Sequence, residues 1–192
     1  MNKDKILIAC ALEQETDGKL DDWNVIYTGC GKVNATYELT AELFLQKKIS
    51  KLPKLVINFG TAGSRDIPIH TLVDCTKFVQ RDIDASSLGF PKTMTPYESS
   101  VPHIINFSKV KNPINKKMSC GTGDSFVTSD KGVTTDVVDM EAYAIAKVCY
   151  LNDIDFISFK YITDDGNADD WKKNCGEGVK EFKKVLEYYD NN

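Results

Sequence analysis

The 192-residue sequence is short of the residues that mark several common classes of protein. It has only two histidines, and none of its six cysteines stands in a C-x-x-C pair, which argues against a zinc site. It has no cluster of lysine and arginine and a formal net charge of -4, so we expect no nucleic-acid partner. No apolar run is long enough to span a membrane, and we expect no membrane association.

The composition that remains is that of a globular protein. Hydrophobic residues make up 42% of the chain, enough for the core of a single domain that we expect to cover residues 1–192. No secretion signal precedes the first strand-like run, and several cysteines, such as Cys10 and Cys149, stand inside apolar runs. A free thiol behaves there as a small buried hydrophobe, so we expect a reducing compartment, the cytoplasm.

The order of apolar segments predicts an α/β fold. Strands alternate with helical patterns, and no internal repeat or domain boundary is visible. Short apolar runs predict strands at 5–12, 24–28, 55–59, 72–79, 118–123 and 156–162. Helical periodicity predicts helices at 32–48, 140–151 and 170–189. The segment 84–100, rich in Ser, Gly, Pro and Thr, is predicted to be a long loop.

Apolar residues gather on one face of two of the predicted helices. In the first helix, Val33, Tyr37 and Phe44 share one face with Thr40, Ala41 and Leu45. In the last, Val179 and Phe182 begin an apolar face that runs to residue 189. We expect the face of the last helix to point inward.

Carboxylates follow two of the predicted strands. Glu13 and Glu15 come after the first strand, and Asp164 and Asp165 after the last. A single acid there is most simply a solvated turn residue or a helix cap. Two such clusters at the carboxyl ends of different strands could instead supply a general base and a general acid to one pocket.

Two further segments allow both a functional and a structural interpretation. Met140 and Glu141 open an apolar helix, where Glu141 could cap the helix or grip the hydroxyls of a sugar while Met140 packs on its ring. Phe126 follows a glycine turn and could stack on a planar base or belong to the core. The glycines at 29–31 and 60–63 are most simply tight turns that need positive φ.

Six motifs in this order resemble the nucleoside phosphorylase and nucleosidase superfamily over nearly the whole chain. They are ALEQE at 11–15, GCGKV at 29–33, NFGTAG at 58–63, GTGDSF at 121–126, VDMEA at 138–142 and ITD at 162–164. The most similar branch is that of the 5′-methylthioadenosine/S-adenosylhomocysteine nucleosidases. The resemblance implies a three-layer α/β/α domain with a mixed, twisted central sheet, a homodimer, a purine nucleoside substrate and no metal or organic cofactor.

The resemblance also implies roles for single residues. Glu15 would activate the attacking water beside Thr61, and Asp164 would protonate N7 of the purine. Phe126 would stack on the base, and the backbone of Val127 would bind its edge.

The sugar would be held by a second group of residues. Met140 and Glu141 match the ribose contacts of these nucleosidases. Lys160 stands where they usually carry a substrate-binding arginine, and Asp139 replaces their glutamate. The chain is also shorter than its relatives before Tyr27 and between residues 90 and 118, regions that help to shape the pocket for the 5′ group.

Hydrolysis is favoured over phosphorolysis. The chain has only two arginines, Arg65 and Arg81, and Glu13 and Glu15 would repel phosphate. Arg65 follows the GTAG motif closely enough to keep a phosphorylase possible. A nucleoside-binding protein without turnover is a third alternative, which the pairing of Glu15 with Asp164 disfavours.

Overall fold

The computed structural model describes residues 3–128 and 134–190, and its centre is an eight-stranded sheet. The strands are β1 Ile6–Cys10, β2 Val25–Tyr27, β3 Leu55–Gly63, β4 Leu72–Gln80, β5 Ile105–Asn106, β6 Met118–Thr122, β7 Val137–Asp139 and β8 Asp155–Asp164. The helices are α1 Lys32–Lys48, α2 Ala142–Leu151, α3 Ala168–Asn174 and α4 Val179–Asp190. Short 3-10 turns lie at Lys3–Lys5, Glu13–Glu15 and Ser86–Leu88. The six predicted strands are therefore present; β5 and β7 were not predicted, because neither stands in an apolar run of more than two residues.

The sheet is mixed. Strand β1 pairs in parallel with β2 and β3, and β3 pairs in parallel with β8. Strand β4 runs antiparallel to β5 and β8, and β7 runs antiparallel to β3. The pairings of β3, β7, β6, β4 and β8 close on themselves, so this half of the sheet curls into a ring.

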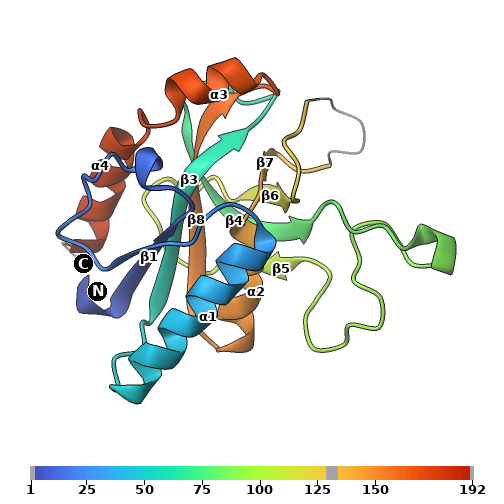
Figure 1. Ribbon diagram of the computed structural model, residues 1–192, viewed down its shortest axis with the longest axis horizontal. Helices are drawn as coiled ribbons and strands as arrows, with labels where there is room; N and C mark the ends of the chain where they lie inside the picture. The colour runs from blue at the N-terminus through green and yellow to red at the C-terminus, as the bar shows by residue number, and fades with distance from the viewer. Residues whose placement is uncertain (1–2, 129–133, 191–192) are drawn as a thin grey trace.

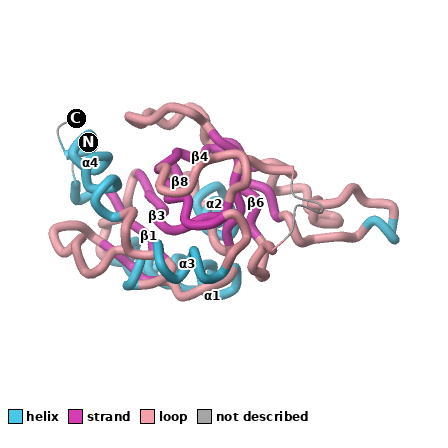
Figure 2. Tube along the Cα trace, turned by 90° about the horizontal axis from the view of Figure 1, so that it is seen from above, coloured by secondary structure: helices cyan, strands magenta, loops and turns pink. Residues whose placement is uncertain are grey.

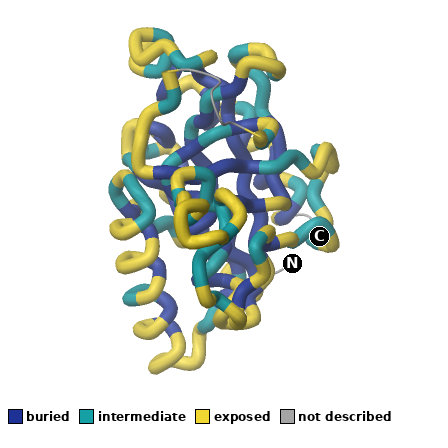
Figure 3. The backbone as a smooth tube through the Cα atoms, turned by 90° about the vertical axis from the view of Figure 1, so that its right-hand side faces the viewer, coloured by how far each residue is buried: buried dark blue, intermediate teal, exposed yellow. Residues whose placement is uncertain are grey.

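Helices cover the sheet on both sides, as Figures 1 and 2 show. Helices α1 and α2 pack on one face, over a core that includes Leu39, Val56 and Ile145. Helix α4 packs on the other face, where Phe182 stacks on Phe59 with ring centroids 4.2 Å apart. Buried residues therefore lie in the middle layer, and exposed residues lie along the outside (Figure 3). The predicted three-layer α/β/α architecture is confirmed.

The face of α1 that carries Val33, Tyr37 and Phe44 points away from the sheet. Val33, Tyr37 and Phe44 are 78%, 69% and 58% exposed, whereas Ala35 and Leu39 are buried against the sheet. The helix carries two apolar stripes at helical spacing, and periodicity cannot tell which one meets the sheet. The stripe with the small residue Ala35 packs inward, and the stripe with larger side chains faces outward.

The predicted helix at 170–189 is two helices, α3 and α4, separated by a turn at 175–178. The turn brings Gly178 against the ring of Tyr161, where an added Cβ would lie 2.5 Å from Cγ. Only glycine fits this close approach without a shift of the ring. The inward face predicted for the second part is confirmed, since Val179, Phe182 and Tyr189 are buried.

The predicted loop at 84–100 is confirmed apart from its one 3-10 turn, and it projects from the body of the protein (Figure 1). Within the described residues, no helix combines the length and apolar character needed to cross a bilayer.

Candidate active site

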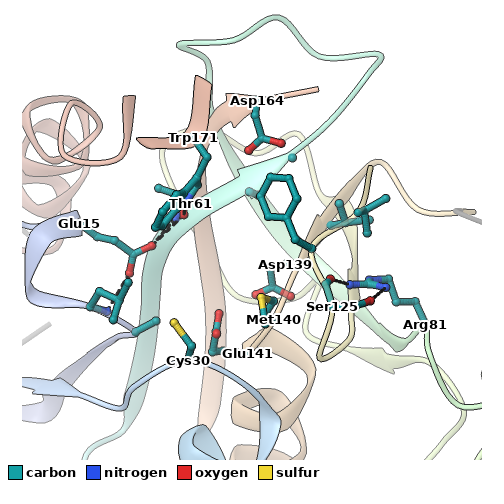
Figure 4. Close-up of a pocket in the computed structure, with 17 residues that line it drawn as sticks. Glu15, Cys30, Thr61, Arg81, Ser125, Asp139, Met140, Glu141, Asp164 and Trp171 are labelled. Atoms are coloured by element: carbon teal, nitrogen blue, oxygen red, sulfur yellow. Dashed lines mark hydrogen bonds between the residues drawn. The ribbon is translucent and has the colours of Figure 1, made fainter. Parts of the chain in front are cut away.

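A cavity of about 200 Å³ opens where β1, β3 and β8 end and α2 begins (Figure 4). Parallel strands bring their carboxyl ends to one edge of the sheet, which is why segments far apart in the sequence meet here. The cavity wall contains all but one of the predicted site residues. They are Glu15, Thr61, Phe126, Val127, Met140, Glu141 and Asp164.

Glu15 is fixed at one side of the cavity by three donors. The backbone N–H and the hydroxyl of Thr61 donate to its Oε1 at 2.8 and 3.0 Å. The backbone N–H of Leu12 donates to Oε2 at 3.1 Å. Only 4% of Glu15 is exposed, and these bonds offset the cost of burying its charge.

Two glycines of β3 make room for the catalytic candidates. A Cβ on Gly60 would lie 3.0 Å from Glu15 Oε1, and one on Gly63 would lie 3.1 Å from Asp164 Oδ1. The prediction of a turn at 60–63 is therefore wrong, because these residues continue the strand. The prediction for Gly29 and Gly31 is correct, since their φ angles are 75° and 91°.

Asp164 ends β8 and is 2% exposed. It accepts hydrogen bonds from Gly166 N–H to Oδ1 and from the Thr163 hydroxyl to Oδ2, both 2.9 Å. Burial raises the pKa of Asp164 above its ordinary value, against the opposing effect of these two bonds. A raised pKa is what a carboxyl group needs to hold a proton and donate it.

Glu141 faces the same cavity from the start of α2 and is 7% exposed. Its Oε1 accepts a 2.8 Å bond from the N–H of Gly31, in the turn before α1. Burial, together with the nearby charge of Asp139, raises the pKa of Glu141 to about 7. The alternative role of helix cap belongs to Asp139 instead, whose Oδ2 accepts from Ala142 N–H at 2.8 Å.

Phe126 is 41% exposed and lines the cavity, which rules out the alternative that it belongs to the core. The glycine turn before it is held by Arg81, whose guanidinium donates to the carbonyl oxygens of Gly123 and Ser125. Asp82 accepts from Asp124 N–H at 2.9 Å on the other side of the turn. The end of β4 thus fixes the segment that presents the aromatic ring.

Lys160 is the predicted site residue that the cavity wall does not include. It is 1% exposed, and its Nζ lies 2.8 Å from Oδ2 of Asp139, which does line the cavity. Burial is the largest single effect on Lys160 and lowers its pKa, but the charges of Asp139, Cys120 and Glu141 and the hydrogen bond to Asp139 together reverse it, so the net direction is upward. Burial is also the largest effect on Asp139 and raises its pKa, but the charge of Lys160 and the hydrogen bonds that Asp139 accepts together lower it overall, so the two form a buried ion pair.

The cavity residues for which no role was predicted include three with reactive or polar side chains: Arg81, Cys30 and Trp171. Arg81 and Cys30 lie in or beside recognisable motifs, which is a signal that could have found them. Trp171 stands in a polar stretch at the start of the helix predicted at 170–189. Nothing in the sequence connects it with Thr61 or Glu15.

The chain matches the family model of the phosphorylase superfamily over residues 17–189. A 5′-methylthioadenosine/S-adenosylhomocysteine nucleosidase of Staphylococcus haemolyticus is 31% identical over 193 residues, covering 88% of this chain and 82% of the relative. This chain belongs to the phosphorylase superfamily.

Solved structures in the superfamily share the fold. A 5′-methylthioadenosine/S-adenosylhomocysteine nucleosidase of Helicobacter pylori, solved with butyl-thio-DADMe-Immucillin-A, superimposes with a TM-score of 0.81 at 19% identity. The match covers 98% of this chain and 100% of that one. Futalosine hydrolase of Helicobacter pylori superimposes with a TM-score of 0.78 at 20% identity, covering 95% of each chain.

Within this superfamily fold, the cavity is acidic. Four carboxylates line it: Glu15, Asp139, Glu141 and Asp164. The guanidinium of Arg81 is engaged by backbone carbonyls, and Arg65 lines a neighbouring cavity where it donates to Thr128 O. Such a surface favours a neutral or cationic reactant over phosphate. The described residues hold no group of three or more His, Cys, Asp and Glu side chains placed to bind a metal ion.

Proposed function

We propose that this protein is a purine nucleosidase that hydrolyses the N-glycosidic bond of 5′-methylthioadenosine and S-adenosylhomocysteine to free base and sugar. The observation that carries the proposal is the placement of Glu15 and Asp164 at separate sides of one cavity, which Glu141 also lines (Figure 4). Two carboxyl groups of this kind can serve as base and acid across a single bond.

The proposed reaction begins at the base. Asp164 donates its proton to N7 of the purine, which makes the purine a better leaving group and weakens the bond to C1′. Phe126 stacks on the base and the backbone of Val127 binds its edge. As the bond breaks, its electron pair goes to the purine and the sugar acquires oxocarbenium character, which the surrounding carboxylates stabilise.

Water then adds to C1′ of the sugar. Glu15 takes a proton from the water while the oxygen of the water bonds to C1′. Glu141 and Met140 hold the ribose. Lys160 lies outside the cavity wall and keeps Asp139 ionised. Asp139 in turn fixes the first turn of α2, next to Glu141. In this proposal Lys160 supports the sugar site without touching the sugar.

The acidic cavity supports water as the nucleophile. A phosphorylase would have to bring a dianion among four carboxylates without a free guanidinium in the wall. A binding protein without turnover would gain nothing from an acid whose pKa is raised by burial.

The test is release of free base from 5′-methylthioadenosine, S-adenosylhomocysteine, futalosine, adenosine and inosine, each with and without phosphate. We expect phosphate-independent release, fastest with the first two. Strict dependence on phosphate would show phosphorolysis in place of hydrolysis. Binding of a nucleoside without release of base would indicate a nucleoside-binding protein without turnover.

Asp164→Asn isolates the proposed acid. The amide can keep the bond from Gly166 N–H but has no proton to give to N7, so we expect kcat to fall by about 100-fold or more. Circular dichroism and the unfolding midpoint should show a folded protein. A fully active variant would show that Asp164 is not the acid.

We also propose that the protein is a homodimer, as the resemblance implies. Val33, Tyr37 and Phe44 of α1 line an apolar groove with Leu151 of α2, and all four are more than half exposed. An apolar face of this kind is unusual on a monomer and suits an interface between two copies. Light scattering should give twice the chain mass, and Phe44→Glu should lower it.

The setting of the reaction belongs to the same proposal. The six free cysteines, five of them buried, suit a reducing compartment, and we propose the cytoplasm. The proposed substrates place the enzyme in methionine salvage. Detection of the protein in a cytoplasmic fraction, and accumulation of methylthioadenosine when it is removed, would test both statements.

A further inference from the structure

Trp171 occupies a fixed position next to the proposed general base. It lies in the first turn of α3, and its backbone N–H donates to Asn167 O at 3.2 Å. The helix is capped by the side chain of Asn167 at one end and tied to β8 at the other, where buried Asn174 donates to Thr163 O at 2.9 Å. These two anchors hold the indole in the cavity wall above Thr61 (Figure 4).

The indole ring makes one polar contact that connects it to Glu15. Its Nε1–H donates to Oγ1 of Thr61 at 3.1 Å, and the Thr61 hydroxyl lies 3.0 Å from Oε1 of Glu15. An indole nitrogen can only donate and an ionised carboxylate can only accept. The direction of both bonds is therefore fixed: Trp171 donates to Thr61, and Thr61 donates to Glu15.

This chain of bonds determines which oxygen of Glu15 is available. Oε1 accepts from both the N–H and the hydroxyl of Thr61, which uses its two acceptor positions. Among the residues that the structure describes, Oε2 accepts from Leu12 N–H alone, which leaves it one acceptor position. A water that loses a proton to Glu15 would therefore lose it to Oε2.

We infer that Trp171 is a positioning residue for hydrolysis, which aligns Glu15 through Thr61 so that Oε2 faces the attacking water. The inference rests on the proposed nucleosidase activity. Donation from Trp171 polarises the Thr61 hydroxyl and prevents it from turning its hydrogen away from Glu15, so the carboxylate stays in one orientation. The bond from Trp171 to Thr61 affects the base that activates water, and not the binding of the nucleoside. Trp171 therefore influences kcat more than KM.

The test is Trp171→Phe, which keeps an aromatic wall and removes the N–H. Loss of one neutral hydrogen bond predicts a fall in kcat of about 5-fold, with KM changed less than about twofold. Trp23→Phe is the matched control, because Trp23 packs under Lys3 outside the cavity wall, and it should keep the wild-type kcat and KM.

A second pair of variants separates positioning from a general structural effect. In a Glu15→Gln background the base is gone, so adding Trp171→Phe should change the residual kcat by less than about twofold. A structural role would lower it again by the same factor. Thr61→Ala should likewise make Trp171→Phe silent, because the connection between the indole and Glu15 is already broken.

The outcomes distinguish the inference from the proposed function. An active wild type with an unchanged Trp171→Phe variant, or equal losses in all backgrounds, overturns the role of Trp171 and leaves the hydrolase intact. A wild type that releases no base from any nucleoside overturns both. If Trp171→Phe unfolds, Thr61→Val decides: a wild-type kcat there would sink the proposed connection.

Discussion

Titration of Glu141 should make the free energy of unfolding depend measurably on pH. Its pKa rises from an ordinary value of 4.5 to about 7, first because it is buried and second because Asp139 is charged. Between these two values the folded protein holds a proton that the unfolded chain releases. The free energy of unfolding must therefore fall as the pH rises through this window.

The size of the effect follows from the same shift. At about 1.4 kcal/mol per pKa unit, the change amounts to about 3 kcal/mol between pH 4.5 and pH 8. Glu141→Gln removes the titrating group and can keep the bond from Gly31 N–H. We expect the variant to gain about 3 kcal/mol relative to the wild type over this range.

Urea unfolding at half-unit steps from pH 4.5 to 8 measures this difference directly. Glu38→Gln, on the exposed side of α1, is the control and should run parallel to the wild type. If the difference between Glu141→Gln and the wild type does not change with pH, the reasoning from burial and the Asp139 charge is refuted.

Two further predictions concern the groups around the cavity. Lys160→Met leaves Asp139 buried without its partner and should cost about 3 to 5 kcal/mol in urea unfolding, whereas Lys184→Met at an exposed ion pair should cost less than about 1 kcal/mol. Equal costs would contradict the buried ion pair. Gly60→Ala places a Cβ 3.0 Å from Glu15 Oε1 and should lower kcat by about 10- to 100-fold; an unchanged kcat would show that the base tolerates displacement.

Some features could be predicted because they are written locally in the chain. Short apolar runs predicted six of the eight strands of the sheet, and acids placed just after two of them marked the carboxyl ends where Glu15 and Asp164 meet. Six motifs in order indicated the superfamily, which the family match confirms. Seven of the eight predicted site residues line one cavity, although their individual roles stay predictions.

Other features depend on partners that are distant in the sequence. Lys160 was predicted to contact the substrate because it stands where the related nucleosidases usually carry arginine, but it pairs with Asp139, and Asp139 lines the cavity whereas Lys160 does not. Periodicity shows that apolar residues of α1 share a face, but it does not show on which side of the helix the sheet lies. Gly178, in the turn between α3 and α4, lies so close to Tyr161 that an added Cβ would be 2.5 Å from Cγ of that ring.

By itself, the sequence determined the class of fold, the superfamily and the identity of the carboxylates at the strand ends, because each depends on neighbouring residues or on short motifs. The tertiary structure decided how those carboxylates are tuned and held. Burial raises the pKa of Asp164 and Glu141, and α3 brings Trp171 within 3.1 Å of Thr61, 110 positions earlier in the chain. Desolvation and hydrogen bonding are set by the surroundings of a group in space, which the order of residues does not show.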